Sequence, residues 1–245
     1  MRYMVGVAAT GAPTWPLFDS LINLQAPDGE GIRYTRCTGL AVDLARNSLV
    51  EDLLLSECEA LLMVDGDAGL HPGTLVRLAS WNVPIVGALA FSRYTPMVPT
   101  ICAGKGDNPN AFLVRVDETV DWLKHHPDLI GVGPALLDPA PKDSLWPLHT
   151  DGGFTGGHCL LVRREVFESL EPPWFLKKPG ARGTQEDRYF CEKAIAAGFP
   201  LYVDRSVVAG HVYGDRQAGA LDFLAWDMVT DWATMGFHVG PKTIA

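Results

Sequence analysis

The chain has 245 residues, of which 47% are hydrophobic and 20% charged, and its formal net charge is −9. This composition is typical of a globular protein with one α/β domain or two small ones, and it excludes a disordered chain. The acidic excess disfavours binding to the phosphate backbones of nucleic acids, so we expect no nucleic acid partner. The apolar runs are only strand-sized, so we expect neither a membrane span nor a secretory leader.

The first half of the chain alternates apolar strand-like runs with segments of helical periodicity. Strands of this kind, apolar on both faces, are typical of a parallel sheet covered by helices. We therefore predict an α/β fold with a doubly wound, mostly parallel sheet and helices on both faces. The predicted strands are residues 3–9, 31–36, 60–65 and 84–91, and the predicted helices are residues 15–24, 39–60 and 73–81.

The second half is richer in Gly, Pro and Asn, and its elements are shorter. Residues 99–111 and 131–157 have loop-like composition. Thr184 is the expected N-cap of a helix that Gly198 ends. We find no repeat and no linker, which favours a single domain. The remaining predicted strands are residues 112–116, 158–162 and one or two within 200–212, and the remaining helices are residues 118–125, 163–170, 184–198 and 218–235.

The five cysteines are odd in number and far apart, and no two of them form a CxxC pair. This spacing indicates free, mostly buried thiols and gives no support for a disulfide framework or a zinc site. Free thiols persist in a reducing compartment, so we expect a cytoplasmic location. The cysteines are Cys37, Cys58, Cys102, Cys159 and Cys191.

Asp65 and Asp67, separated by Gly66, follow the apolar run 60–65. Alternate residues of a strand lie roughly 6–7 Å apart on one face. Two ionised carboxylates at that distance repel by about 2–3 kcal/mol at an effective dielectric near 20. A divalent cation such as Mg²⁺ or Mn²⁺ relieves this repulsion, and the carboxyl ends of strands are where open α/β sheets bind ligands. The simpler alternative is two solvated aspartates in a turn.

Several phosphate-binding families lack their required residues here. Haloacid dehalogenase-like phosphatases have the motif DxDx[TV], with Thr or Val at the fifth position, where this chain has Gly69. No GDxxxD motif follows. The loop that begins after residue 7 has Ala12-Pro13 where a P-loop needs Lys and Ser or Thr, and no GxGxxG is present. The basic glycine-rich motif of nucleotide-sugar pyrophosphorylases is missing too.

Over residues 3–212 the sequence resembles glycosyltransferases of the GT-A fold, in their family-two-like branch. The resemblance is carried by the DxD at 65–67, "ARN" at 45–47, "PIVGALAFSRYTP", "GGHCLLVRREVFESL" and "QEDRYFCEKAIAAGFPLYVDRSVVAGHV", in the family's order. It implies one GT-A-like domain over residues 1–245. Residues 1–98 would form a nucleotide-binding half, residues 99–217 an acceptor and catalytic half, and residues 218–245 a helix and tail.

The resemblance also implies roles for individual residues. Asp65, Asp67 and the late His211 would hold Mn²⁺ or Mg²⁺ against the diphosphate of a nucleotide-sugar, where a cation stabilises the leaving group. Asp187 would be the catalytic base, with Glu186 as the alternative. The expected nucleotide-sugar contacts are Ala8, Thr10, Arg46, Asn47, Asp65, Gly66, Gly156 and Gly157, and the candidates for stacking on sugar rings are Trp146, Trp174 and Phe175.

Each of these residues also has a purely structural interpretation. Arg46 and Asn47 fit a solvated helix face, His211 a strand end, and the acids at 186–187 the positive end of a helix dipole. We therefore expect a metal-dependent glycosyltransferase, with inversion favoured because a candidate base is present. Its acceptor hydroxyl belongs to a protein, a glycan, a small molecule or a modified base. The alternatives are a metal-dependent phosphohydrolase and a non-catalytic module that binds a nucleotide or glycan.

Overall fold

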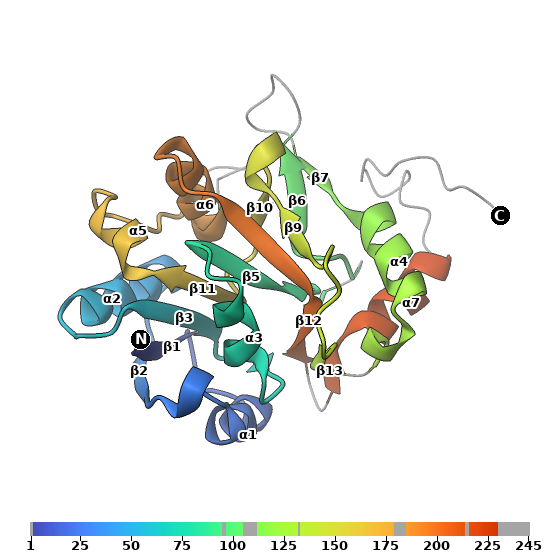
Figure 1. The fold of residues 1–245 in the computed structure, drawn as a ribbon, viewed down its shortest axis with the longest axis horizontal. Coiled ribbons are helices and arrows are strands. Elements are labelled where there is room, and N and C mark those ends of the chain that lie inside the picture. Colours follow the sequence, from blue (N-terminus) through green and yellow to red (C-terminus); the bar gives the residue numbers. More distant parts are fainter. Residues whose placement is uncertain are drawn as a thin grey trace.

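The computed structural model describes residues 2–94, 97–104, 112–131, 133–178, 185–213 and 216–229, except for the side chains of residues 112, 113 and 229. Its centre is a large sheet with strand order β13-β12-β5-β11-β3-β1-β2 (Figure 1). These strands are β1 (Tyr3–Ala9), β2 (Ile32–Thr38), β3 (Ala60–Asp65), β5 (Ile85–Ala90), β11 (Cys159–Arg163), β12 (Leu201–Tyr213) and β13 (Arg216–Ala218).

Five of these seven strands run in the same direction. β1 pairs in parallel with β2 and β3, and β5 pairs in parallel with β12. β11 is inserted between β3 and β5 and runs antiparallel to both. The predicted mostly parallel sheet is therefore confirmed, with one reversed strand in its middle. Because of that reversal, the first residues of β11 lie next to the carboxyl ends of β3 and β5, at one end of the sheet.

Helices cover both faces of the sheet, as predicted. One face packs a core that includes Leu49 of α2, Val166 of α5 and Phe190 of α6. The other face packs Leu17 of α1 and residues of α3. The helices are α1 (Trp15–Asn23), α2 (Val42–Leu54), α3 (Thr74–Ser80), α4 (Val116–His125), α5 (Arg164–Glu168), α6 (Glu186–Ala196) and α7 (Ala220–Val229), with short 3-10 turns η1 (Pro27–Gly29), η2 (Pro127–Leu129) and η3 (His149–Asp151).

The winding of the sheet reverses at β1, which has β2 on one side and β3 on the other. A crevice beyond the carboxyl ends of the strands is expected where the order reverses, and such crevices hold ligands in open α/β sheets. β3 ends at Asp65, so the aspartate pair lies at this switch point.

Short strands form where the sequence has loop-like composition, which corrects the prediction for residues 99–111 and 131–157. β6 (Ile101–Gly104) lies between β10 (Phe154–Thr155) and β7 (Phe112–Val114) in a second sheet. β4 (Ala68–Gly69), β8 (Ala135–Leu136) and β9 (Leu145–Pro147) all pair with β12. Segments of two to four residues depend on tertiary pairing, so their composition does not reveal them.

The element boundaries in the second half also differ from the predictions. β12 is one continuous strand, with a register shift between Asp204 and Val208, where one or two short strands were expected. α4 begins at Val116, two residues before the predicted helix, and β7 is correspondingly short. Thr184 lies outside the described residues, and Gln185 is the N-cap of α6 without a side-chain hydrogen bond. Residues 230–235 of the last predicted helix are likewise outside the description.

All five cysteines are free, and four of them are buried, as the sequence predicts. In the described ranges, none of the helices has the length and apolar content needed to cross a bilayer.

Candidate functional site

The Asp65-Gly66-Asp67 turn is held tightly against the end of β1. The Gly66 N–H donates to the Ala8 carbonyl at 2.9 Å, and the Thr14 N–H donates to the Gly66 carbonyl at 2.9 Å. A Cβ on Gly66 would lie 2.5 Å from the Cβ of Ala9, so only glycine fits without a shift. These contacts fix the backbone of the turn and thereby the positions of the two aspartates.

Arg46 connects this turn to α6 through the buried interior. Its guanidinium is 2% exposed, with Nη2 2.7 Å from Asp65 Oδ1 and Nη1 2.6 Å from Glu186 Oε1. Burial opposes ionisation of Asp65, but Arg46 and His158 hold the pKa of its carboxyl well below its usual range. A Cβ on Gly157 would lie 2.5 Å from Arg46 Cζ, so Gly157 makes room for the guanidinium. Arg46 was predicted to contact the nucleotide, but here it binds two carboxylates.

Asp67 meets His211 of β12. His211 Nε2 is 3.4 Å from Asp67 Oδ2, and His211 Nδ1 is 3.0 Å from the Phe91 carbonyl oxygen. The Val212 N–H donates to the Asp67 carbonyl at 2.7 Å, which fixes the turn to β12. Burial would raise the pKa of the Asp67 carboxyl, but the neighbouring His211 lowers it overall. Arg93, which follows β5, also donates to Asp67 Oδ2.

His158 is a further buried histidine between the two aspartates. Its Nε2 is 2.9 Å from the Gly210 carbonyl oxygen, its Nδ1 is 3.5 Å from Asp65 Oδ2, and its ring lies 4.3 Å from the His211 ring. Neither His158 nor Arg93 stands out in the sequence. A histidine at the start of a strand points to this edge only if that strand is known to be antiparallel, which sequence periodicity does not reveal.

Asp187 and Glu186 lie at the N-terminus of α6 and have different environments. Glu186 is buried and paired with Arg46. Asp187 accepts hydrogen bonds from the Gly157 N–H at 3.4 Å and from the Arg188 N–H at 2.7 Å. Burial raises the pKa of Asp187 to about 6, against the attraction of Arg46. A carboxyl with this pKa is suited to exchange a proton near neutral pH.

Asn47 binds the backbone of Trp174 and Phe175. Its Nδ2 donates to the Phe175 carbonyl at 2.7 Å, and its Oδ1 accepts from the Trp174 N–H at 2.9 Å and the Phe175 N–H at 3.1 Å. Both aromatic rings are buried, at 7% and 0% exposure, so they belong to the core and do not stack on a ligand. Trp146 is half-buried, with the Arg115 and Arg205 guanidinium groups at 4.4 and 4.5 Å from its ring centroid.

The other residues predicted to contact the nucleotide-sugar are Ala8, Thr10, Gly156 and Gly157. Ala8 is buried and uses its carbonyl to bind Gly66, whereas Thr10 is exposed in the loop after β1. The Gly156 N–H donates to the Thr100 carbonyl at 2.9 Å, next to Gly157. The contacts of these residues with a nucleotide-sugar stay predictions.

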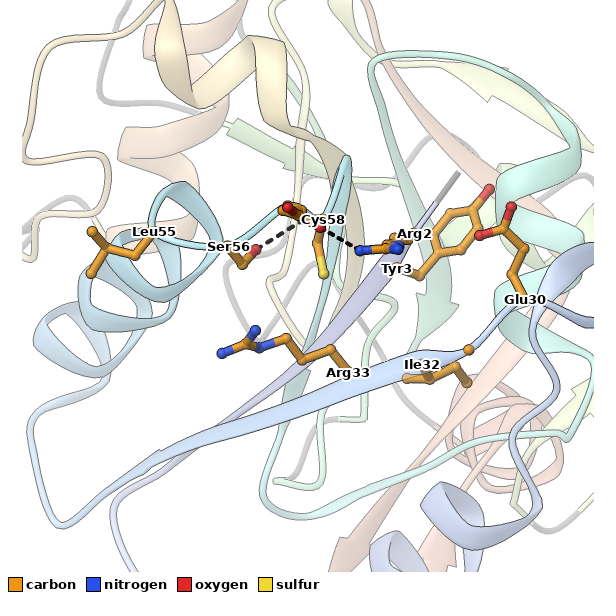
Figure 2. Close-up of a pocket in the computed structure, with 10 residues that line it drawn as sticks. Arg2, Tyr3, Glu30, Ile32, Arg33, Leu55, Ser56 and Cys58 are labelled. Atoms are coloured by element: carbon orange, nitrogen blue, oxygen red, sulfur yellow. Dashed lines mark hydrogen bonds and ion pairs between the residues drawn. The ribbon is translucent and has the colours of Figure 1, made fainter.

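Two cavities lie away from this edge. One of about 440 Å³ lies at the opposite end of the strands, where Arg2, Tyr3, Glu30, Arg33 and Ser56 line it (Figure 2). Another of about 620 Å³ lies between α1 and β2, with Phe18, Ile22 and Tyr34 in its walls. Neither is lined by the aspartates, histidines or arginine of the candidate site.

No protein-family model matches the sequence, and no curated protein matches it. Among solved structures, A197 from STIV matches with a TM-score of 0.54 at 16% identity, over 90% of this chain and 91% of that one. S. aureus TarS 1–349 matches with a TM-score of 0.41 at 13% identity, over 85% of this chain and 60% of that one. At this level of identity, the similarity to A197 shows a shared fold and nothing more. The similarity to TarS is too low to support any conclusion. The chain is a single-domain α/β protein with a GT-A-like fold.

Proposed function

We propose that this protein is a metal-dependent glycosyltransferase that moves a sugar from a nucleoside-diphosphate sugar to an acceptor hydroxyl with inversion. The observation that carries the proposal is the contact between Asp67 and His211. The carbonyl of Phe91 can only accept a hydrogen bond, so Nδ1 of His211 carries the proton when the ring is neutral. Its Nε2 lone pair then faces the Asp67 carboxylate at 3.4 Å, and a cation between the two acceptors makes the arrangement favourable.

The charges around the turn support the same proposal. Four carboxylates, those of Asp65, Asp67, Glu186 and Asp187, gather around two guanidinium groups, those of Arg46 and Arg93. With neutral histidines this leaves an excess of two negative charges. A bound Mn²⁺ or Mg²⁺ would offset it and would also balance the charge of a leaving diphosphate.

Asp187 is the proposed base. Its carboxylate takes the proton of the acceptor hydroxyl while that oxygen forms a bond to the anomeric carbon. The bond from this carbon to the diphosphate breaks, and the nucleoside diphosphate leaves with the electron pair. Attack from the side opposite the leaving group inverts the anomeric centre. The Gly157 N–H, 3.4 Å from Asp187 Oδ2, supports the carboxylate in its orientation.

The phosphohydrolase alternative requires Asp65 to act as a nucleophile. Asp65 Oδ1 is held by Arg46, and the lowered pKa of the carboxyl indicates a tightly bound, weakly basic group. This environment disfavours attack on phosphorus. A module that binds a nucleotide or glycan without turnover would keep the aspartate turn but would not need Asp187.

The test is a binding and turnover experiment on the full chain. UDP, GDP, ADP, CDP and dTDP are screened by thermal shift with and without Mn²⁺, on wild type, Asp67→Asn, Asp187→Asn and the exposed control Asp19→Asn. A ligand at 100 times its Kd adds about 2.7 kcal/mol of stability. We expect one nucleotide to stabilise the protein only with Mn²⁺, and Asp67→Asn to abolish the effect.

Asp187→Asn separates the enzyme from the binding module. We expect this variant to retain the metal-dependent thermal shift on nucleotide binding. We expect it to lose the hydrolysis or transfer of the matching nucleotide-sugar. If Asp187→Asn turns over at the wild-type rate, the assignment of the base is wrong. If no nucleotide stabilises the protein, with Mn²⁺ or without it, the glycosyltransferase proposal is wrong.

A further inference from the structure

We infer that His158 is a second imidazole ligand of the cation that Asp67 and His211 bind. This inference rests on the proposed function for the presence of an ion, and it adds a residue that the sequence analysis did not select. One ligand atom from each of these three residues lies within 4.8 Å of the other two. The distances of a bound ion to nitrogen and oxygen, about 2.0–2.2 Å, require only a small inward movement of such a set.

The proton of a neutral His158 ring is fixed on Nε2. This nitrogen is 2.9 Å from the Gly210 carbonyl oxygen, which accepts and cannot donate. Nδ1 therefore keeps its lone pair. His158 is 4% exposed, and Nδ1 has no hydrogen-bond partner in the described part of the chain. A buried acceptor without a donor is costly, and a cation would satisfy it.

The two histidines repeat one arrangement. In each ring one nitrogen binds a backbone carbonyl, Phe91 for His211 and Gly210 for His158. In each ring the other nitrogen faces an aspartate of the turn, at 3.4 Å for His211 and 3.5 Å for His158. Histidines that bind metals in proteins commonly donate their second N–H to a carbonyl in this way, which fixes the tautomer and the ring orientation.

Asp65 presents only one oxygen to this set. Its Oδ1 is held by Arg46, while Oδ2 lies on the side of His158. Arg46 thus positions the aspartate next to the imidazoles, and the three-residue set of Asp67, His158 and His211 supplies one carboxylate and two nitrogens. Imidazole suits Zn²⁺, Fe²⁺ and Ni²⁺, and first-row transition ions in general bind nitrogen more readily than Mg²⁺, which prefers oxygen ligands and retains its water. The inference therefore predicts preference for a transition metal.

The competing arrangement is an imidazolium. If Nδ1 carried a second proton, His158 would donate to both Asp65 and Gly210 and would bind no ion. The two arrangements give different counts of metal-bound nitrogen, so they can be separated directly.

The experiment loads the full chain with Mn²⁺ and counts the directly coordinated ¹⁴N nuclei by pulsed EPR. We expect two nitrogens in wild type and one in both His158→Gln and His211→Gln. The glutamine at 158 keeps an N–H for the Gly210 carbonyl but removes the imidazole lone pair. His125→Gln, on the exposed face of α4, is the matched control and should retain two nitrogens.

Titration with Mn²⁺ and Mg²⁺ gives a second readout. We expect His158→Gln to weaken Mn²⁺ binding by about 10–100-fold, the scale on which changes around a metal site act, with a much smaller effect on Mg²⁺. One coordinated nitrogen in wild type, unchanged by His158→Gln, would overturn the inference while Mn²⁺-dependent nucleotide binding still supports the proposed function. Two nitrogens without any nucleotide binding would support the metal site and contradict the glycosyltransferase proposal.

Discussion

The buried Arg46 guanidinium holds Glu186 with a 2.6 Å ion pair and thereby distinguishes two acids that are neighbours in the sequence. The next residue, Asp187, has no cationic side chain within ion-pair distance among the described residues, and its carboxylate is supported by backbone N–H groups. One acid of the pair is thus neutralised by the fold, and the other is available for proton transfer.

This difference predicts opposite effects of substituting the two acids. Asp187→Asn should lower kcat by about 10²–10⁴-fold, the contribution expected of a general base, and should not destabilise the protein at neutral pH, because it removes a buried charge. Glu186→Gln should destabilise the protein by about 3–5 kcal/mol because it leaves part of a buried guanidinium charge uncompensated. Turnover assays and urea unfolding of both variants measure the two effects. Equal losses of activity at equal stability would contradict the assignment.

The raised pKa of Asp187 predicts an acidic limb in the pH profile. Because burial raises this pKa to about 6, the base is protonated below that pH, and kcat/KM should fall tenfold per pH unit there. The folded state also binds this proton more tightly than the unfolded chain, in which the pKa of Asp187 is near 3.8. Wild type should therefore gain stability relative to Asp187→Asn as the pH falls from 6 toward 4. A difference independent of pH would contradict the burial of this group.

Gly157→Ala tests the space that the guanidinium needs. The added Cβ would lie 2.5 Å from Arg46 Cζ, so the arginine must shift away from Asp65 and Glu186. We expect a loss of about 1–3 kcal/mol, typical of overpacking, together with weaker ion binding. Gly31→Ala is the matched control, because nothing lies within 4 Å of its added Cβ. Chemical denaturation and Mn²⁺ titration of both variants give the comparison.

Arg93 occupies the Asp67 oxygen that the proposed cation would use. Its guanidinium donates to Oδ2, the same oxygen that faces His211. Arg93→Gln should therefore strengthen Mn²⁺ binding measured without nucleotide, by a few-fold at this partly exposed position. Calorimetric titration of wild type and variant checks this. Weaker ion binding by the variant would indicate that Arg93 helps to build the site.

Asn47→Ala should affect stability and leave nucleotide affinity unchanged. The amide binds the backbone of Trp174 and Phe175 in three hydrogen bonds, each worth about 1 kcal/mol net, so the expected loss is about 2–4 kcal/mol. The nucleotide-dependent thermal shift, measured relative to the ligand-free variant, should equal that of wild type. A reduced thermal shift would instead support the nucleotide contact that the sequence predicts for this residue.

Much of the first half of the fold is predictable from the sequence. The strands at 3–9, 60–65 and 84–91 are apolar on both faces and separated by amphipathic helices, so period and length identify them. The short strands β6, β8, β9 and β10 are not predictable in this way. Their residues have turn-like composition, and they form strands only through pairing with distant segments. β8 and β9 pair with β12, and β10 pairs with β6.

The candidate site is predictable to a similar extent. The aspartate pair and His211 stand out because each follows an apolar strand, and the structure brings Asp67 and His211 together. The ion, the donor and the reaction stay predictions. His158 was missed because its position depends on the reversed direction of β11, and the ion pair of Arg46 with Glu186 was missed because helical periodicity does not reveal the buried acid that reaches it from α6.

The late position of β12 in the chain has a consequence for folding. Asp67 lies in the first third of the sequence, but the imidazoles beside it belong to residues 158 and 211, and the carbonyl that orients one of them is that of Gly210. Contacts of such long sequence separation form slowly and late. During synthesis the aspartate turn therefore emerges long before its partners. An ion that needs all three side chains binds only the completed domain, and its binding energy stabilises that state alone.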